Sequence, residues 1–152
     1  MNEICEKAEG FLNTVVGDME FDLDISAEWS DDDGCTVNFT GEDVPIILSE
    51  NGELLDAFET LLFQLYGRDL EREHRFICDA DGFRGTRKSE LAAMAKFAAK
   101  NVREKGVPFT FGDLNSTERR MIHLTLKDDD DLFTESVGMG RDRRLRVSLK
   151  EE

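Results

Sequence analysis

The stretch EFDLDISAEWSDDDGCTVNFT, residues 20–40, alternates apolar and polar residues on both sides of an acidic turn. Strict alternation is typical of a strand with one buried face, because successive side chains point to opposite sides of a sheet. The apolar positions are Phe21, Leu23, Ile25, Ala27 and Trp29 before the turn, and Val37 and Phe39 after it. Since SDDDG, residues 30–34, has the composition of a tight turn, we predict a β-hairpin.

Helical periodicity lies on both sides of this hairpin. Before it, residues 2–16 carry apolar residues at helical spacing up to Gly17: Ile4, Ala8, Phe11, Leu12 and Val15. After it, GEDVPIIL, residues 41–48, and ELLDAFETLLFQLYG, residues 53–67, predict a short and a long helix. The long helix is expected to bury Leu54, Phe58, Leu61, Leu62 and Leu65. With a strand at residues 72–80, the order is α-β-β-α-α-β.

A second group of elements follows DADGFRGTRK, residues 79–88, which we predict to be a hinge. Residues 89–106 form a helical pattern with one apolar stripe: Leu91, Ala95, Ala98 and Val102. VPFTF, residues 107–111, predicts a short strand, and Asn115 with Glu118 is a variant of the capping box that begins a helix.

The C-terminal residues predict a second hairpin. LFTESV, residues 132–137, and RRLRVSL, residues 143–149, are separated by Gly138 and Gly140. Alternation places Leu145, Val147 and Leu149 inward, and Arg144 and Arg146 outward. The expected fold class is therefore α+β, in two small α/β modules.

Charge divides the chain at the hinge. Residues 1–83 carry 22 acidic and 4 basic residues, a net charge of −18, whereas residues 84–152 carry 12 and 15, a net charge of +3. We therefore expect one module at residues 1–83 and another at residues 84–152, and a polyanion should bind the second.

Several classes of protein do not fit this sequence. No apolar run approaches the roughly 20 residues of a membrane-spanning helix, and the acidic start MNEICEKAEG is not a secretory signal, so the cytoplasm is the expected location. Cys5, Cys35 and Cys78 lack CxxC spacing, which favours buried reduced thiols over a disulfide framework or a zinc site.

No catalytic, cofactor or metal site is expected. The acidic runs at residues 31–33 and 128–131 lack the spacing of a calcium-binding loop and are read as surface acids. His74 has no sequence-evident partner, Ser49 lacks a nucleophile-elbow sequence, and no phosphate-binding or dinucleotide loop is present.

TERRMIHLTL, residues 117–126, gathers cationic groups in this acidic chain. At about 100° per residue, one face holds Arg119, Arg120, His123 and Lys127, and the opposite arc is largely apolar. Arg119 and His123 are neighbours at i and i+4, a pair that can grip one phosphate. A solvated basic face and an ordinary hydrogen-bonded histidine remain the alternatives.

Arg119-x-x-x-His123 in ERRMIHLTL, followed by TESVGMGRDRRLRVSL, resembles the R-three-H domain, a small α/β module that binds single-stranded nucleic acid. The order of DADGFR, an alanine-rich helix, ERRMIH and TESVG resembles the C-terminal half of the bacterial Jag (SpoIIIJ-associated) family. That family joins a type II KH domain to an R-three-H domain, and the α-β-β-α-α-β order agrees. The resemblance implies cytoplasmic RNA binding associated with cell-envelope growth and membrane-protein insertion.

The resemblance also implies nucleic-acid-binding positions. Arg119, Arg120 and His123 match the ERR-x-x-H motif, and Arg84 matches within DADGFR. Arg144 and Arg146 are our own inference from strand alternation, since they could extend the same basic patch.

The KH-like half departs from the KH pattern at its phosphate-binding loop. Where such domains have GxxG, this chain has Ser49, Glu50, Asn51 and Gly52, so a carboxylate stands where a cation is usual. We therefore expect single-stranded RNA, not distinguished from DNA, to bind the second module. The alternative is an adaptor whose acidic half binds a protein partner or forms a dimer.

Overall fold

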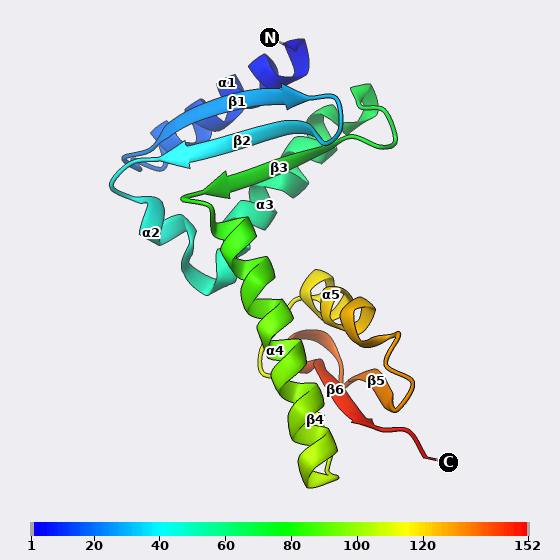
Figure 1. Cartoon of the computed structure of the whole chain (residues 1–152). Coiled ribbons are helices and arrows are strands. Elements are labelled where there is room, and N and C mark those ends of the chain that lie inside the picture. Colours follow the sequence, from blue (N-terminus) through cyan, green and yellow to red (C-terminus); the bar gives the residue numbers. More distant parts are fainter. Residues whose placement is uncertain (1, 152) are drawn as a thin grey trace. The chain divides into compact units, whose positions relative to one another are not determined.

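The computed structural model describes residues 2–151. These residues form two compact units that divide between Arg84 and Gly85 (Figure 1). No helix within residues 2–151 is long and apolar enough to cross a membrane.

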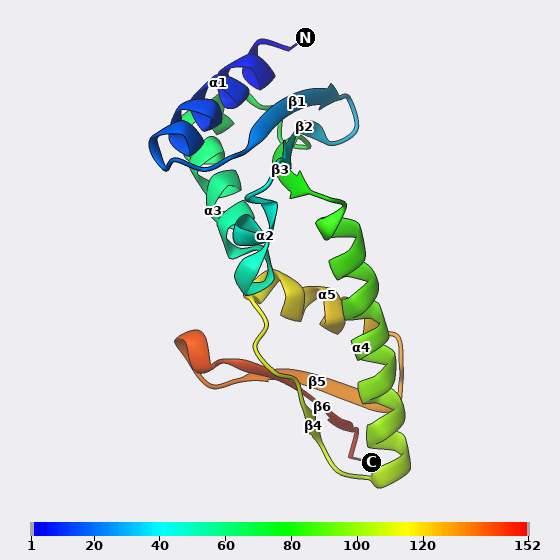
Figure 2. The same ribbon diagram turned by 90° about the vertical axis from the view of Figure 1, so that its left-hand side faces the viewer.

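The first unit is a three-stranded sheet covered on one face by helices. Its elements are α1 (Glu3–Asp18), β1 (Asp24–Ser30), β2 (Gly34–Thr40), α2 (Val44–Ile47), α3 (Ser49–Tyr66), a 3₁₀ turn at Gly67–Asp69 and β3 (Arg75–Ala80). The strand order is β1-β2-β3, with β1 and β2 antiparallel and β2 and β3 parallel. Both views place α1 and α3 on the same face of this sheet (Figures 1 and 2).

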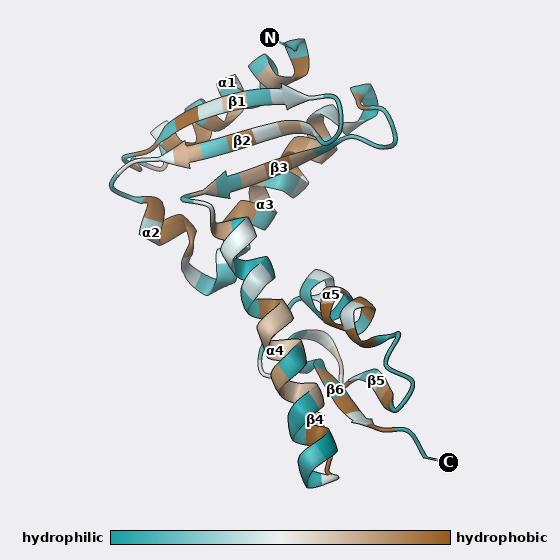
Figure 3. Ribbon diagram, in the orientation of Figure 1, coloured by the Kyte–Doolittle hydropathy of each residue, from teal (hydrophilic) through white to brown (hydrophobic). Residues whose placement is uncertain are grey.

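The hairpin predicted at residues 20–40 is confirmed. Ala27 lies opposite Val37 in the β1–β2 register, and both side chains are buried. Phe39 is fully buried and stacks on Phe58 of α3, with 5.4 Å between ring centroids. The apolar residues of the strands therefore pack against the helices. The alternation of apolar and polar residues along the strands is visible in Figure 3.

The buried stripe of α3 differs from the predicted one. Leu55, Phe58 and Leu62 are buried, whereas Leu61 and Leu65 are 40% and 52% exposed. Two adjacent leucine stripes fit the helical period equally well, and a single sheet face can bury only one of them. The prediction of Leu61 and Leu65 as core residues is thus wrong. Helix α1 also continues through Gly17 to Asp18.

The second unit packs two helices on an antiparallel sheet. It contains α4 (Phe83–Lys105, which begins in the first unit), β4 (Phe109–Thr110), α5 (Ser116–Leu126), β5 (Leu132–Val137), a 3₁₀ turn at Gly140–Asp142 and β6 (Arg144–Leu149). The strand order is β4-β6-β5. The predicted stripe of α4 is buried, the predicted hairpin of β5 and β6 is present, and Leu145 and Val147 are buried. Leu149, which was predicted to point inward, is 40% exposed.

Helix α4 begins inside the segment that was predicted to be a hinge. Strand β3 ends at Ala80, and the left-handed backbone of Asp81 and Gly82 turns the chain directly into the helix. The Asp79 carboxylate accepts hydrogen bonds from the backbone N–H groups of Ala80 and Arg84, at 2.8 and 3.1 Å. A side chain upstream of the helix thus satisfies one of its free N–H groups, so six residues expected to be loop, 83–88, are helical.

Candidate nucleic-acid interface

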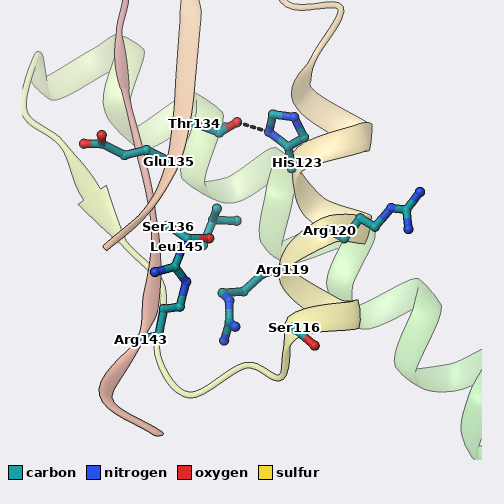
Figure 4. Close-up of a pocket in the computed structure, with 9 residues that line it drawn as sticks. All are labelled: Ser116, Arg119, Arg120, His123, Thr134, Glu135, Ser136, Arg143 and Leu145. Carbon is teal, nitrogen blue, oxygen red and sulfur yellow. Dashed lines mark hydrogen bonds between the residues drawn. The ribbon is translucent and has the colours of Figure 1, made fainter. Parts of the chain in front are cut away.

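A pocket of about 420 Å³ lies between α5 and the β5–β6 hairpin in the second unit. Its lining residues come from α5, from β5 and from β6 with the residue before it: Ser116, Arg119, Arg120, His123, Thr134, Glu135, Ser136, Arg143 and Leu145. Figure 4 shows Arg119, His123 and Thr134 facing the space between helix and strands, whereas Glu135 points away from α5. The Arg119, Arg120 and His123 side chains that the sequence analysis singled out therefore line one pocket.

Arg119 is held in place by the backbone that precedes its helix. Its Nη1 donates a 2.6 Å hydrogen bond to the carbonyl oxygen of Leu114, and the side chain is half-buried. A guanidinium has five N–H donors, so most of them are not used by this bond. Figure 4 shows Arg119 between α5 and Arg143, whereas Arg120 points away from the strands. The two arginines of the motif thus offer one fixed and one freely exposed cation.

His123 is attached to strand β5. Its Nδ1 forms a short hydrogen bond with the hydroxyl of Thr134, drawn in Figure 4. This contact orients the imidazole and does not involve Nε2. The ring is therefore positioned by a side chain that lies beyond the motif, on the neighbouring strand, and Nε2 remains for a ligand.

Glu118 sets the position of the helix that carries these groups. Its side chain and that of Asn115 form the capping box predicted from the sequence, with Asn115 Oδ1 accepting from the Glu118 N–H at 2.9 Å. One carboxylate oxygen of Glu118 accepts from the Asn115 N–H at 3.2 Å, and the other pairs with Nε of Arg87 on α4. Desolvation acts to lower the pKa of Arg87, but hydrogen bonds to Glu118 and Glu90 raise it above its ordinary value.

The arginines of β6 do not extend this pocket as expected. Thr134 pairs with Val147 and Ser136 with Leu145, so the pocket lies on the buried side of the hairpin. Arg144 and Arg146 alternate with those buried residues and project from the opposite face. Side chains alternate along a strand, so neither can share a face with Leu145.

Both of these arginines also have partners of their own. Arg146 forms an ion pair with Glu135, with 3.1 Å between its Nε and Oε1, and Arg144 donates to the carbonyl oxygen of Arg141 at 2.7 Å. The arginine that does line the pocket is Arg143. Alternation continued one step back along the chain places Arg143 on the same face of the hairpin as Leu145 and Val147. The tertiary structure adds that this is the face beside α5.

Comparison with known proteins identifies the family of this chain. The R-three-H domain family matches residues 89–149. Over 148 residues the chain is 30% identical to the RNA-binding protein KhpB of Clostridium symbiosum, in a match that covers 97% of this chain and 67% of that protein. It is also 28% identical over 149 residues to the RNA-binding protein KhpB of Bacillus subtilis (strain 168), covering 95% and 70% of the two chains. The chain belongs to the KhpB (Jag) family.

In this KhpB-family chain Arg84 lies before the R-three-H match and in the first unit. Its guanidinium donates to both carboxylate oxygens of Glu59 at 3.0 Å and to the Cys78 carbonyl oxygen at 3.0 Å, and it pairs with Asp56 at 2.8 Å. These contacts engage all three guanidinium nitrogens in joining α3, β3 and the start of α4. Arg84 was expected to contact nucleic acid, and the structure places it in an internal ion-pair network.

Residues 49–52 of this KhpB-family chain, compared with a KH loop in the sequence analysis, have an unusual backbone. Glu50, Asn51 and Gly52 follow one another with φ values of 53°, 55° and 76°, and the Ser49 hydroxyl donates to the Ile46 carbonyl oxygen at 2.7 Å. A Cβ built on Gly52 would lie 2.5 Å from the ring of Phe83, so any other residue there would displace that ring and would also have to adopt a positive φ. The exposed side chains at the turn include Glu50, and residues 41–60 contain six acids and no lysine or arginine.

The cysteines of the KhpB-family chain are buried and free, in agreement with the sequence analysis. Cys5 Sγ lies 2.7 Å from Cys35 Sγ, and burial raises the pKa of both thiols. Within residues 2–151 no group of three or more potential ligands is placed to hold a metal ion.

Proposed function

We propose that this chain binds single-stranded RNA through the pocket between α5 and the β5–β6 hairpin of its R-three-H domain. The observation that carries the proposal is the convergence of Arg119, His123 and Arg143 on one pocket in a chain with a net charge of −15. The two relatives described above are named RNA-binding proteins. Nothing in the proposed role requires a catalytic group or a cofactor.

The chemistry of the pocket suits a nucleotide unit. Arg119 and Arg143 supply charged donors for a phosphate, and Arg120 adds an exposed cation at the rim. The His123 ring can donate from Nε2 or stack against a base. The hydroxyls of Ser116 and Ser136 lie at the same pocket and can hydrogen-bond to a sugar or phosphate oxygen.

The first unit is proposed to contribute little RNA affinity. A phosphate a few ångströms from the Glu50 carboxylate would be repelled by about 1–4 kcal/mol, depending on the effective dielectric. Residues 1–83 form the KH-like domain of this proposal and residues 84–152 the R-three-H domain.

In the second candidate function the acidic first unit, with a net charge of −18, binds a basic protein. Under either function the proposed location of the chain is the cytoplasm.

Fluorescence anisotropy with a labelled single-stranded RNA pool tests the proposal. The wild type should bind at low salt, and affinity should fall as salt rises, because neutralised phosphates release counterions. Arg119→Ala/His123→Ala should lose most of this binding, while Arg68→Ala/Arg72→Ala, exposed arginines of the first unit, should not. Circular dichroism of each variant separates loss of contact from loss of fold.

Two results would redirect the interpretation. Affinity that is independent of salt, or unchanged in Arg119→Ala/His123→Ala, would leave α5 with a structural role. A protein pull-down that is lost when acidic residues of the first unit are reversed in charge would then favour the adaptor function.

A further inference from the structure

The segment that joins β5 to β6 is an ordered tip with an unusual surface. Gly138 and Gly140 have φ values of 87° and 59°, which place the chain in the left-handed region favoured by glycine. The Asp142 N–H donates to the Met139 carbonyl oxygen at 3.2 Å, and the Arg143 N–H donates to that of Gly140 at 3.3 Å. The tip, residues 138–143, therefore has a defined conformation.

Met139 is the most exposed large apolar side chain within residues 2–151, at 84%. A single exposed apolar residue is common on protein surfaces and is not by itself evidence of a binding site. Its surroundings are what distinguish it. Residues 138–146 contain four arginines and one aspartate, in a chain with a net charge of −15. The tip thus combines a flexible apolar side chain with a local positive charge.

The arginines of the tip divide into two kinds. Arg143 donates from Nη1 to the Gly138 carbonyl oxygen at 2.9 Å, and Arg144 donates to the carbonyl oxygens of Arg141 and Arg143 at 2.7 and 3.1 Å. These two side chains brace the loop. The Arg141 side chain is exposed and forms no ion pair with any other part of the described chain. Met139, Arg141 and Asp142 are therefore the exposed side chains of the tip that do not brace it.

Arg143 connects this tip to the pocket. It braces Gly138 and also lines the space beside Arg119 and His123 (Figure 4). A chain of phosphates that contacts Arg143 in the pocket is therefore adjacent to the tip. This continuity favours a nucleic-acid strand over a separate protein or a lipid surface as the occupant.

We propose that the RNA strand held in the pocket continues over the β5–β6 tip, where Arg141 contacts a phosphate and Met139 packs against a base. This inference rests on the proposed function and extends it from a single nucleotide unit to a path of several. A thioether is soft and flexible, so it can cover the face of any base without sequence preference.

RNAs of different lengths distinguish contacts at the tip from contacts in the pocket. We would measure anisotropy with RNAs of about four and about ten nucleotides, which bracket a short site and an extended one. Met139→Ala and Arg141→Ala should each weaken binding of the longer RNA by roughly three- to tenfold and leave the shorter one nearly unchanged. Met19→Ala and Arg68→Ala, exposed residues of the first unit, are the matched controls.

The salt dependence of RNA affinity distinguishes the phosphate contact of Arg141 from the base contact of Met139. Arg141→Ala should reduce the slope of log affinity against log salt by about 0.7, the value for one phosphate contact on a single strand. Met139→Ala should lower affinity and leave that slope unchanged. In spectra of methyl-labelled methionine, the Met139 signal should shift on addition of the longer RNA, and the Met19 signal should not.

Several results would overturn the inference. Unchanged affinity for the longer RNA in both tip variants, or equal losses for both lengths, would show that the strand does not continue over the tip. Binding to anionic lipid vesicles would be measured for the same tip variants. If Met139→Ala or Arg141→Ala lost vesicle binding but kept its RNA affinity, the tip would be a membrane contact. Full RNA affinity in Arg119→Ala/His123→Ala would instead remove the proposed function itself, and with it this extension.

Discussion

Glu118 and Arg87 form an ion pair between α5 and α4, with 2.5 Å between Oε2 and Nε and side-chain exposures of only 8% and 15%. The same carboxylate caps α5 through its second oxygen, which accepts from the Asn115 N–H at 3.2 Å. One side chain therefore both begins the helix that carries Arg119 and His123 and attaches that helix to α4. The arrangement of the pocket depends on a residue that does not line it.

Replacing Glu118→Gln should destabilise the second unit. Removing one partner of a buried pair costs about 3–5 kcal/mol when no other charge compensates, and we expect less here because Glu90 also pairs with Arg87 at 3.2 Å. Amide exchange of α5 in the full chain measures the effect. The control is Glu90→Gln, whose side chain is 55% exposed and should cost less than about 1 kcal/mol. Equal losses in the two variants would contradict this account.

Replacing Thr134→Val should weaken RNA binding without unfolding the domain. The substitution keeps the size of the side chain and removes the hydroxyl that orients His123. An imidazole free to rotate should bind roughly three- to tenfold more weakly, the scale of one modest hydrogen bond. Anisotropy and thermal unfolding measure the two effects separately. Thr125→Val, at an exposed threonine on the helix that carries His123, should bind as the wild type does.

Replacing Gly52→Ala should destabilise the first unit. A left-handed alanine costs roughly 1–2 kcal/mol, and displacement of the Phe83 ring adds about 1–3 kcal/mol of overpacking. Gly82→Ala is the matched control, because Gly82 also has a positive φ of 66° but nothing within 4 Å of an added Cβ. Urea unfolding should therefore show a larger loss for Gly52→Ala, and equal losses would exclude the steric contribution of Phe83.

Glu59 should make the first unit less stable as pH rises. Burial raises its pKa from 4.5 to about 7, although the charge of Arg84 acts in the opposite direction and that of Asp56 adds to the rise. The folded chain then binds this proton more tightly than the unfolded chain. Its contribution to stability is therefore fully present below about pH 4.5 and is lost as pH rises through about 7.

The comparison of wild type with Glu59→Gln measures this contribution. Between about pH 5 and pH 8 the wild type should lose up to roughly 3 kcal/mol of unfolding free energy relative to the variant. Glu53→Gln, at an exposed acid on the same helix, should show no such pH-dependent difference. A constant difference between wild type and Glu59→Gln across this range would mean that Glu59 is ionised throughout.

Much of this protein follows from local patterns in the chain. Period-two alternation located both hairpins, because half-buried strands need one apolar face. The capping box at Asn115 and Glu118 marked the start of α5, and the i, i+4 spacing placed Arg119 beside His123. These features depend on residues within a few positions of one another, so they can be read without knowing the fold.

Packing between elements decided the rest. Which leucine stripe of α3 is buried depends on where the sheet lies, and the helical period cannot distinguish Leu62 from Leu61. Whether an arginine near the hairpin faces the pocket depends on which side of the sheet α5 covers, which separated Arg143 from Arg144 and Arg146. Arg84 was assigned to nucleic acid by resemblance, but carboxylates distant in sequence surround it. The sequence determined the elements and the charged groups they carry, whereas the tertiary structure determined which of those groups meet, because such contacts join residues far apart in the chain.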